Sequence, residues 1–135
     1  MTESIPNSAQ TWITTCEGCK GAGWAERGES QTDGARLADA IERRADPAGI
    51  RTRRVSCTMG CERACNVIVQ AEGKIGYSLG KFDGTEADAE AIVAYARLHA
   101  ASATGQVPFR DWPQGVKGHF VSRQVPLPVE GDAER

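Results

Sequence analysis

The five cysteines of this chain are confined to two short windows, and this clustering constrains the fold more than any other feature. Cys57, Cys61 and Cys65 recur at every fourth position between two β-like runs. Cys16 and Cys19 lie far upstream, at the end of another β-like run. An odd number of cysteines argues against a framework of disulfides. The sequence therefore predicts a metal or iron–sulfur site built from two facing loops.

Length and composition are those of an ordinary single domain. The chain has 135 residues, enough to bury a modest core without crosslinks. Its net charge of −2 carries no signature of nucleic-acid binding. The longest apolar stretch is too short to cross a membrane, and the N-terminus lacks the pattern of a secretory signal. We therefore expect a cytoplasmic protein with reduced thiols and with no nucleic-acid or membrane partner.

Hydrophobic periodicity predicts the element order β-α-β-β-β-α. One helix is expected from about Asp33 to the break at residues 46–49, and another from the capping box of Asp83 and Glu86 to about Ala101. A helix between the first two strands implies a parallel crossover, and the last two strands form a hairpin. This pattern is typical of a thioredoxin-like α/β sandwich. The strands are expected at residues 11–15, 50–56, 66–71 and 74–79.

The chain divides into three parts. Residues 1–10 are polar and form a flexible N-terminal tail, and residues 11–104 form the thioredoxin-like domain. Residues 105–135 hold four of the six prolines, so we expect an extended C-terminal tail rather than a helix. The tail is expected to pack on the domain through four apolar residues: Val107, Phe109, Trp112 and Phe120.

The cysteine spacing supplies two pairs of thiolates. A [2Fe–2S] cluster is held by four thiolates, two on each iron. Cys16 with Cys19, and Cys57 with Cys61, provide these pairs from two loops that parallel strands bring to the same end of the sheet. Gly18, beside the first pair, lets backbone N–H groups approach the sulfurs. We predict these four cysteines as the ligands of the cluster.

Three other interpretations of the cysteines stay open. A structural zinc site with four thiolates uses the same pairs. A thioredoxin-type dithiol at Cys16 and Cys19 is a second alternative, although its first cysteine favours a helix N-terminus and a Gly-rich loop follows here. The third is that the clustering is a coincidence. Cys65 is interpreted as a small buried hydrophobe, with a replacement ligand or a regulatory thiol as the alternatives.

The run Val55-Ser56-Cys57-x-x-x-Cys61, followed by an apolar strand, a hairpin and a capped helix, resembles the thioredoxin-like [2Fe–2S] ferredoxins. The resemblance implies a one-electron carrier that docks an unidentified redox partner protein and that often pairs as a homodimer. The first pair is more tightly spaced here than in many of those ferredoxins, so a ligand set with Cys65 in place of Cys19 is an alternative.

Over roughly residues 11–125 the chain also resembles a bacterial family of small predicted metal-binding proteins of unknown function. Its members are sometimes associated with cobalamin-synthesis genes. The resemblance is carried by the five cysteines and by segments such as Lys74-Ile75-Gly76-Tyr77 and Val107-Pro108-Phe109-Arg110.

Other residues are given ordinary roles. His99 and His119 are expected at or near the surface rather than as ligands. Lys20 and Arg63 are candidates to offset the negative charge of a cluster, and Trp24 is a candidate for a docking surface. No nucleophile–base pair is visible, so we expect an electron carrier rather than an enzyme. The sequence therefore predicts a [2Fe–2S] ferredoxin-like protein, with Zn²⁺ as the alternative metal.

Overall fold

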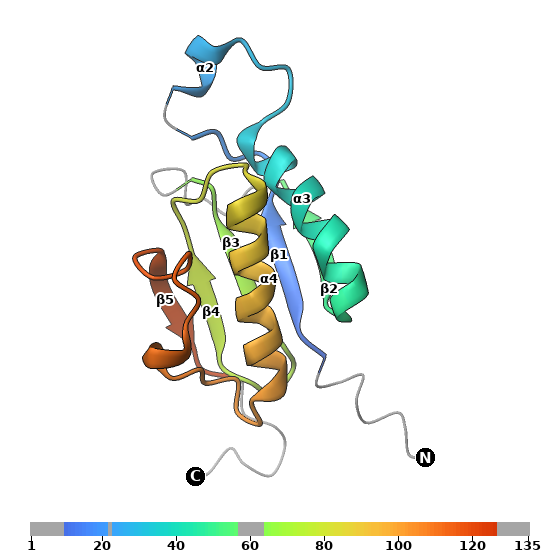
Figure 1. The fold of residues 1–135 in the computed structure, drawn as a ribbon, viewed down its shortest axis with the longest axis vertical. Coiled ribbons are helices and arrows are strands. Elements are labelled where there is room, and N and C mark those ends of the chain that lie inside the picture. Colours follow the sequence, from blue (N-terminus) through green and yellow to red (C-terminus); the bar gives the residue numbers. More distant parts are fainter. Residues whose placement is uncertain (1–9, 22, 57–63, 127–135) are drawn as a thin grey trace.

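The computed structural model describes residues 10–21, 23–56 and 64–126. These residues form a five-stranded sheet with the order β2-β1-β3-β4-β5 (Figure 1). The strands are β1 (Trp12–Cys16), β2 (Arg51–Val55), β3 (Val67–Gln70), β4 (Gly76–Leu79) and β5 (Phe120–Gln124). The helices are α2 (Trp24–Arg27), α3 (Asp33–Ala48) and α4 (Glu86–Ala101), with a 3₁₀ turn, η2, at Phe109–Asp111.

The pairing of the strands confirms the predicted topology. β1 and β2 are parallel and α3 joins them, as the crossover requires. β3 runs antiparallel to β1 and forms a hairpin with β4. In this register Cys16 lies opposite Val55 on one side, and Thr15 lies opposite Val67 on the other. The carboxyl ends of β1 and β2 and the start of β3 therefore meet at one end of the sheet.

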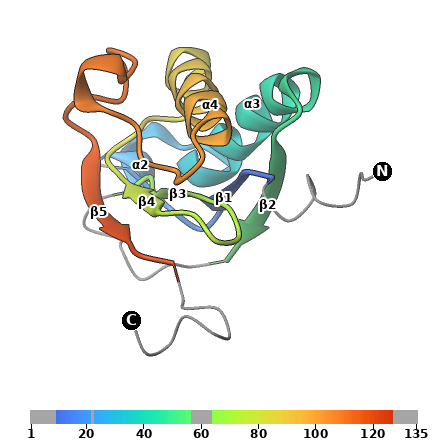
Figure 2. The ribbon, with the colours of Figure 1, turned by 90° about the horizontal axis from the view of Figure 1, so that it is seen from below.

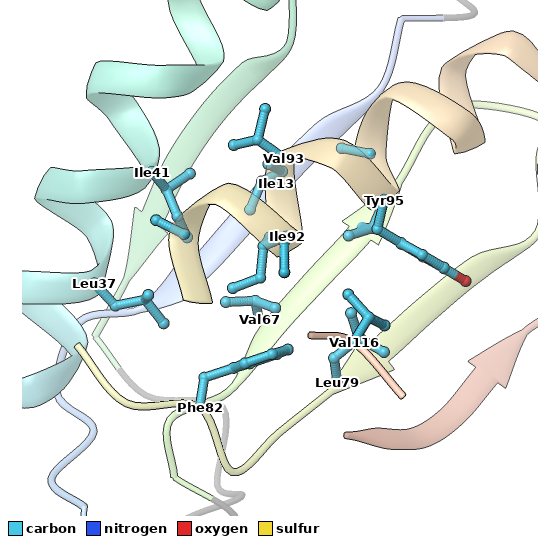
Figure 3. Packing of buried hydrophobic residues seen from close by; sticks show 14 of the residues in the cluster. Ile13, Leu37, Ile41, Val67, Leu79, Phe82, Ile92, Val93, Tyr95 and Val116 are labelled. Carbon is cyan, nitrogen blue, oxygen red and sulfur yellow. The ribbon is translucent and has the colours of Figure 1, made fainter. Parts of the chain in front are cut away.

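The two long helices, α3 and α4, lie on the same side of the sheet (Figure 2). Alternate strand residues point toward them, so Ile13, Val67 and Leu79 are buried. Leu37 of α3 and Ile92 of α4 are also buried, and their side chains pack against those of the strands (Figure 3). The inward face that periodicity predicts for α3 is confirmed. Burial of this apolar surface is the main force that holds the layers together.

The start of α4 differs from the predicted capping box. The N-cap is Thr85, whose hydroxyl accepts a hydrogen bond from the Asp88 backbone N–H at 3.1 Å. Asp83 lies two residues before the cap, and its own N–H donates to the Asp88 carboxylate at 2.6 Å. Thr85 adopts the extended backbone conformation that a cap requires. The capping interaction is therefore shifted by two residues from its predicted position.

The C-terminal segment is more ordered than a tail. Residues 120–124 lack proline and add to β4 as an antiparallel fifth strand, which the sequence analysis did not anticipate. Prolines 108 and 113 flank the 3₁₀ turn instead. Val107 is buried, and Trp112 packs edge-on against Tyr95 with ring centroids 5.5 Å apart. Packing of this segment on the body is confirmed, although Phe109 and Phe120 remain largely exposed.

We expected His99 at or near the surface, but it is fully buried. The Thr11 hydroxyl donates to its Nδ1 at 2.9 Å, and its Nε2 donates to the Ile75 carbonyl oxygen at 2.7 Å. His99 lies on the inward stripe of α4, whereas the next residue, Ala100, is exposed. A buried imidazole needs both ring nitrogens paired, and these two partners provide that. No helix among the described residues is long and apolar enough to cross a membrane.

Candidate functional site

The first cysteine pair lies just beyond the carboxyl end of β1. Cys16 is the last residue of the strand, and a turn at Glu17 and Gly18 brings the chain back to Cys19. The Cys19 N–H donates to the Cys16 carbonyl oxygen at 3.3 Å, which closes the turn. Both cysteines are buried and carry free thiols. A single short turn therefore brings two buried cysteines together.

The start of α3 holds this turn from one side. The Gly34 N–H donates to the Cys19 carbonyl oxygen at 2.9 Å. The Thr32 hydroxyl donates to the Glu17 carbonyl oxygen and also accepts from the Ala35 N–H at 3.0 Å, so it caps the helix. A Cβ atom at position 34 would stand 2.1 Å from the Cys16 carbonyl oxygen. Only glycine allows the helix to approach the cysteine turn this closely.

Asp33 fastens the following loop to the same helix. Its buried carboxylate accepts hydrogen bonds from the Gly21 N–H at 2.6 Å and from the guanidinium groups of Arg27, at 2.5 Å, and Arg36. Burial alone would raise the pKa of Asp33, but the hydrogen bonds from Arg27 and Gly21 outweigh it and lower that pKa. The helix begins at Asp33, as predicted, but Thr32 caps it, and Asp33 ties the loop after Cys19 to the helix.

The start of β3 holds the turn from the other side. The Cys16 N–H donates to the Asn66 carbonyl oxygen at 3.1 Å. The preceding residue, Cys65, exchanges two backbone hydrogen bonds with Phe82, at 3.0 and 3.3 Å. Cys65 has no exposed surface, which confirms its predicted burial. Burial is the main cause that raises the pKa of its thiol to about 12, and the neighbouring Cys19 adds to it.

Asn66 is the residue of this site that the sequence analysis missed. Its side-chain amide donates to the Cys19 sulfur at 3.5 Å. Burial and a hydrogen bond with Cys16 raise the pKa of Cys19 to about 11, whereas the side-chain and backbone N–H groups of Asn66 act in the opposite direction. A polar residue directly after Cys65 and before the apolar run 67–69 was the available signal. Nothing local in the sequence indicated that this amide would reach Cys19.

The second cysteine pair, Cys57 and Cys61, and also Arg63, lie outside the described residues. The residues on either side of that segment are described. Val55 accepts a hydrogen bond from the Glu17 N–H at 2.9 Å, and a Cβ atom at Gly18 would stand 2.4 Å from the Ser56 carbonyl oxygen. The chain therefore enters the segment beside the Cys16–Cys19 turn and leaves it through Cys65, next to the same turn.

The described part of the site fits one half of a thiolate-bound metal centre. Cys16 and Cys19 bring two buried sulfurs together, and Asn66 directs N–H groups at one of them. Burial raises the pKa of the Cys19 thiol, and a bound cation would supply the positive charge that favours its thiolate. Within the described residues, no three His, Cys, Asp or Glu side chains lie close enough to hold a metal together. Cys65 as a ligand in place of Cys19 stays a prediction.

Other residues singled out in the sequence contact groups other than the sulfurs. His119 stacks on Phe82, with ring centroids 4.2 Å apart, and its Nδ1 pairs with the Gly80 carbonyl oxygen at 2.8 Å. Lys20 places its ammonium over the ring of Trp24, 4.6 Å from the centroid. Trp24 is only partly exposed, and its indole N–H donates to the Gln31 carbonyl oxygen at 2.9 Å. These contacts engage Lys20 and Trp24 with the loop itself.

Comparisons with known proteins agree with this fold. The model of a family described as "Protein of unknown function (DUF1636)" matches residues 13–126. A search of curated proteins found no match. Among solved structures, a thioredoxin-like [2Fe-2S] ferredoxin from Aquifex aeolicus is similar with a TM-score of 0.50 and 16% sequence identity, over 87% of this chain and 94% of that one. At this identity the likeness shows the fold alone, and it confirms the predicted thioredoxin-like architecture.

Proposed function

The chain belongs to the DUF1636 family, and from that premise we propose that it is a ferredoxin-like protein that carries one electron at a time on a [2Fe–2S] cluster. The observation that carries the proposal is the buried Cys16–Cys19 pair, with the N–H groups of Asn66 directed at the Cys19 sulfur. N–H donors pair better with a thiolate than with a thiol, because hydrogen bonds to a charged acceptor are stronger. The site is therefore suited to sulfurs that carry negative charge against a metal.

In this proposal Cys16 and Cys19 hold one iron, and Cys57 and Cys61 hold the other. The second pair stays a prediction, supported by the position of Val55 and Cys65 beside the first turn. The cluster, when bound, supplies a one-electron couple whose potential depends on burial and on hydrogen bonds to the sulfurs. The chain itself holds the sulfurs, keeps water away from them and supplies N–H donors.

The rest of the proposal follows from an electron-carrying role. The protein would work without an active site of its own, in the cytoplasm, by docking a redox partner protein that is not yet identified. Pairing as a homodimer and a link to cobalamin metabolism rest on family resemblance and are proposed on that basis only.

A zinc site is the second candidate, because the buried Cys-x-x-Cys pair suits zinc equally well. A dithiol redox protein is less well supported. The first cysteine of a reactive dithiol favours a helix N-terminus, whereas Cys16 is the last residue of β1 and is followed by a turn.

Metal analysis of anaerobically purified protein tests the proposal. We expect iron and sulfide in equal amounts, about two of each per chain, with visible absorption and a rhombic EPR signal that appears only on reduction. Zinc without sulfide, in a colourless protein, would replace the electron carrier with a structural zinc module. Protein that binds neither metal, even after reconstitution with iron and sulfide, would refute both candidates.

A further inference from the structure

We propose that Asn66 is the positioning residue of this metal site: it fixes the Cys16–Cys19 turn and donates an N–H···S hydrogen bond that strengthens metal binding at Cys19. The inference rests on the proposed function, because it concerns the same thiolates. It goes further by assigning the control of one ligand to a residue outside the cysteine motifs.

Asn66 contacts both ends of the turn. Its carbonyl oxygen accepts from the Cys16 N–H at 3.1 Å, and its side-chain Nδ2 donates to the Cys19 sulfur at 3.5 Å. Only 9% of its surface is exposed, so these contacts are shielded from water. One residue therefore sets the distance between the strand end that carries Cys16 and the sulfur that follows three residues later.

The backbone around Asn66 is fixed before any metal binds. The preceding residue, Cys65, is locked to Phe82 by two backbone hydrogen bonds. The following residue, Val67, is paired with Thr15 on β1 and with Leu79 on β4. The sheet therefore positions the Asn66 side-chain amide next to Cys19. A donor that is already in place loses little conformational entropy when the metal-bound thiolate forms.

The chemistry of the two partners indicates what the contact is for. A neutral thiol is a weak acceptor, so a buried amide N–H that faces it is poorly used. A metal-bound thiolate is a charged acceptor, and the same contact then becomes stronger. Partners of this kind around metal ligands are typically worth roughly 10- to 100-fold in metal affinity. In a cluster, an N–H donor also favours the more negative reduced state, which raises the reduction potential.

Three described cationic side chains of this region, which could offset the charge of a cluster, have other partners. Lys20, which the sequence analysis proposed to offset the cluster charge, lies over Trp24 instead. Arg27, which is exposed, and Arg36, which is half-buried, both bind Asp33. Among the described residues, Asn66 therefore provides a side-chain N–H donor within hydrogen-bond distance of a cysteine sulfur.

The test uses Co²⁺ as a probe of the metal-free protein, because thiolate-to-cobalt charge-transfer bands report the sulfurs directly. Two variants separate the donor from its volume: Asn66→Ala removes the side chain, and Asn66→Leu keeps a branched side chain of similar shape without the N–H or a charge. The matched control is Gln70→Ala at the far end of β3, the strand that follows Asn66, because the Gln70 amide contacts Arg53 and Thr14 rather than a cysteine. Urea unfolding of each protein verifies that it folds.

We expect both Asn66 variants to bind Co²⁺ roughly 10- to 100-fold more weakly than the original protein, with the charge-transfer band moved to lower energy, and Gln70→Ala to bind normally. In cluster-loaded protein, Asn66→Ala should also lower the reduction potential. Folded Asn66 variants with unchanged affinity and an unchanged band would overturn the inference while leaving the metal site intact. An original protein that binds neither Co²⁺ nor a cluster would instead overturn the proposed function, and the inference with it.

Discussion

Replacing Gly34 with alanine tests the close approach of α3 to the cysteine turn. The added methyl group would stand 2.1 Å from the Cys16 carbonyl oxygen and 3.1 Å from the Cys19 backbone nitrogen. Ordinary contacts of a Cβ atom begin at 3.4 Å, so the helix and the turn must move apart by more than 1 Å. That movement also stretches the 2.9 Å hydrogen bond from the Gly34 N–H to the Cys19 carbonyl oxygen.

Local helix propensity and tertiary packing predict opposite signs for the change in the free energy of unfolding. Helix propensity alone favours alanine over glycine by about 1 kcal/mol. Against this stand about 1–3 kcal/mol for forcing an extra methyl group into a packed site and about 1 kcal/mol for the lost hydrogen bond. We therefore expect Gly34→Ala to lower the free energy of unfolding by about 1–3 kcal/mol. The same movement should weaken Co²⁺ binding, because it displaces Cys16 and Cys19.

Urea denaturation of the metal-free protein measures this change as a lower midpoint with an unchanged slope. The control is Gly28→Ala, where φ is +68° and no atom lies within 4 Å of the added Cβ. That variant should lose about 1 kcal/mol through backbone strain alone and bind Co²⁺ normally. A Gly34→Ala protein as stable as the original, or more stable, would refute the packing of α3 against the turn.

Three further predictions follow from the same structure. Cys16→Ala should abolish cluster or zinc binding, whereas Cys65→Ala should keep the metal in elemental analysis and lose only about 1 kcal/mol of packing; a metal-free Cys65→Ala protein would make Cys65 a ligand. Burial lowers the pKa of His99, so the unfolded chain takes up its proton first and stability should fall as the pH drops below about 6.5; in His99→Gln that part of the loss, followed by urea unfolding at several pH values, should be absent. The pKa of Asp33 is lowered because hydrogen bonds from Arg27 and Gly21 favour its charged carboxylate, so the stability that Asp33 contributes is present above about pH 4 and is lost as the pH falls through the folded pKa. Asp33→Asn should thus be destabilised at pH 7 and approach the original protein in acid. An equal difference in stability at both pH values would contradict the role of the Arg27 contact.

Much of the fold could be predicted because its causes are local. The spacing of Leu37 and Ile41 along one face of a helix, and the β-branched runs before each cysteine window, depend only on near neighbours in the chain. The parallel crossover then followed from the handedness of strand–helix–strand units. The cap of α4 was misplaced because Asp83 and Thr85 are both capping residues, and the sequence does not indicate which of them has the extended backbone.

The site was predictable to the same extent. The Cys-x-x-Cys spacing places two sulfurs together in a single turn, and the positions of both windows at strand ends indicated a shared edge of the sheet. The assignment of Cys16, Cys19, Cys57 and Cys61 as ligands stays a prediction. The fifth strand was missed because residues 120–124 are exposed and alternate poorly, so they carry no burial signal. Their strand conformation comes from the free edge of β4.

By itself, the sequence determined β1 to β4, the two long helices α3 and α4 and their order in the chain, since each depends on contacts between residues close in the chain. Only the tertiary structure decided which polar groups complete the cysteine site and the core. Asn66 reaches Cys19 across 47 residues, and Thr11 reaches His99 across 88. A buried hydrogen bond of this kind leaves no periodic pattern in either segment. It exists because the sheet and α4 bring a donor and an acceptor together where water cannot replace either one.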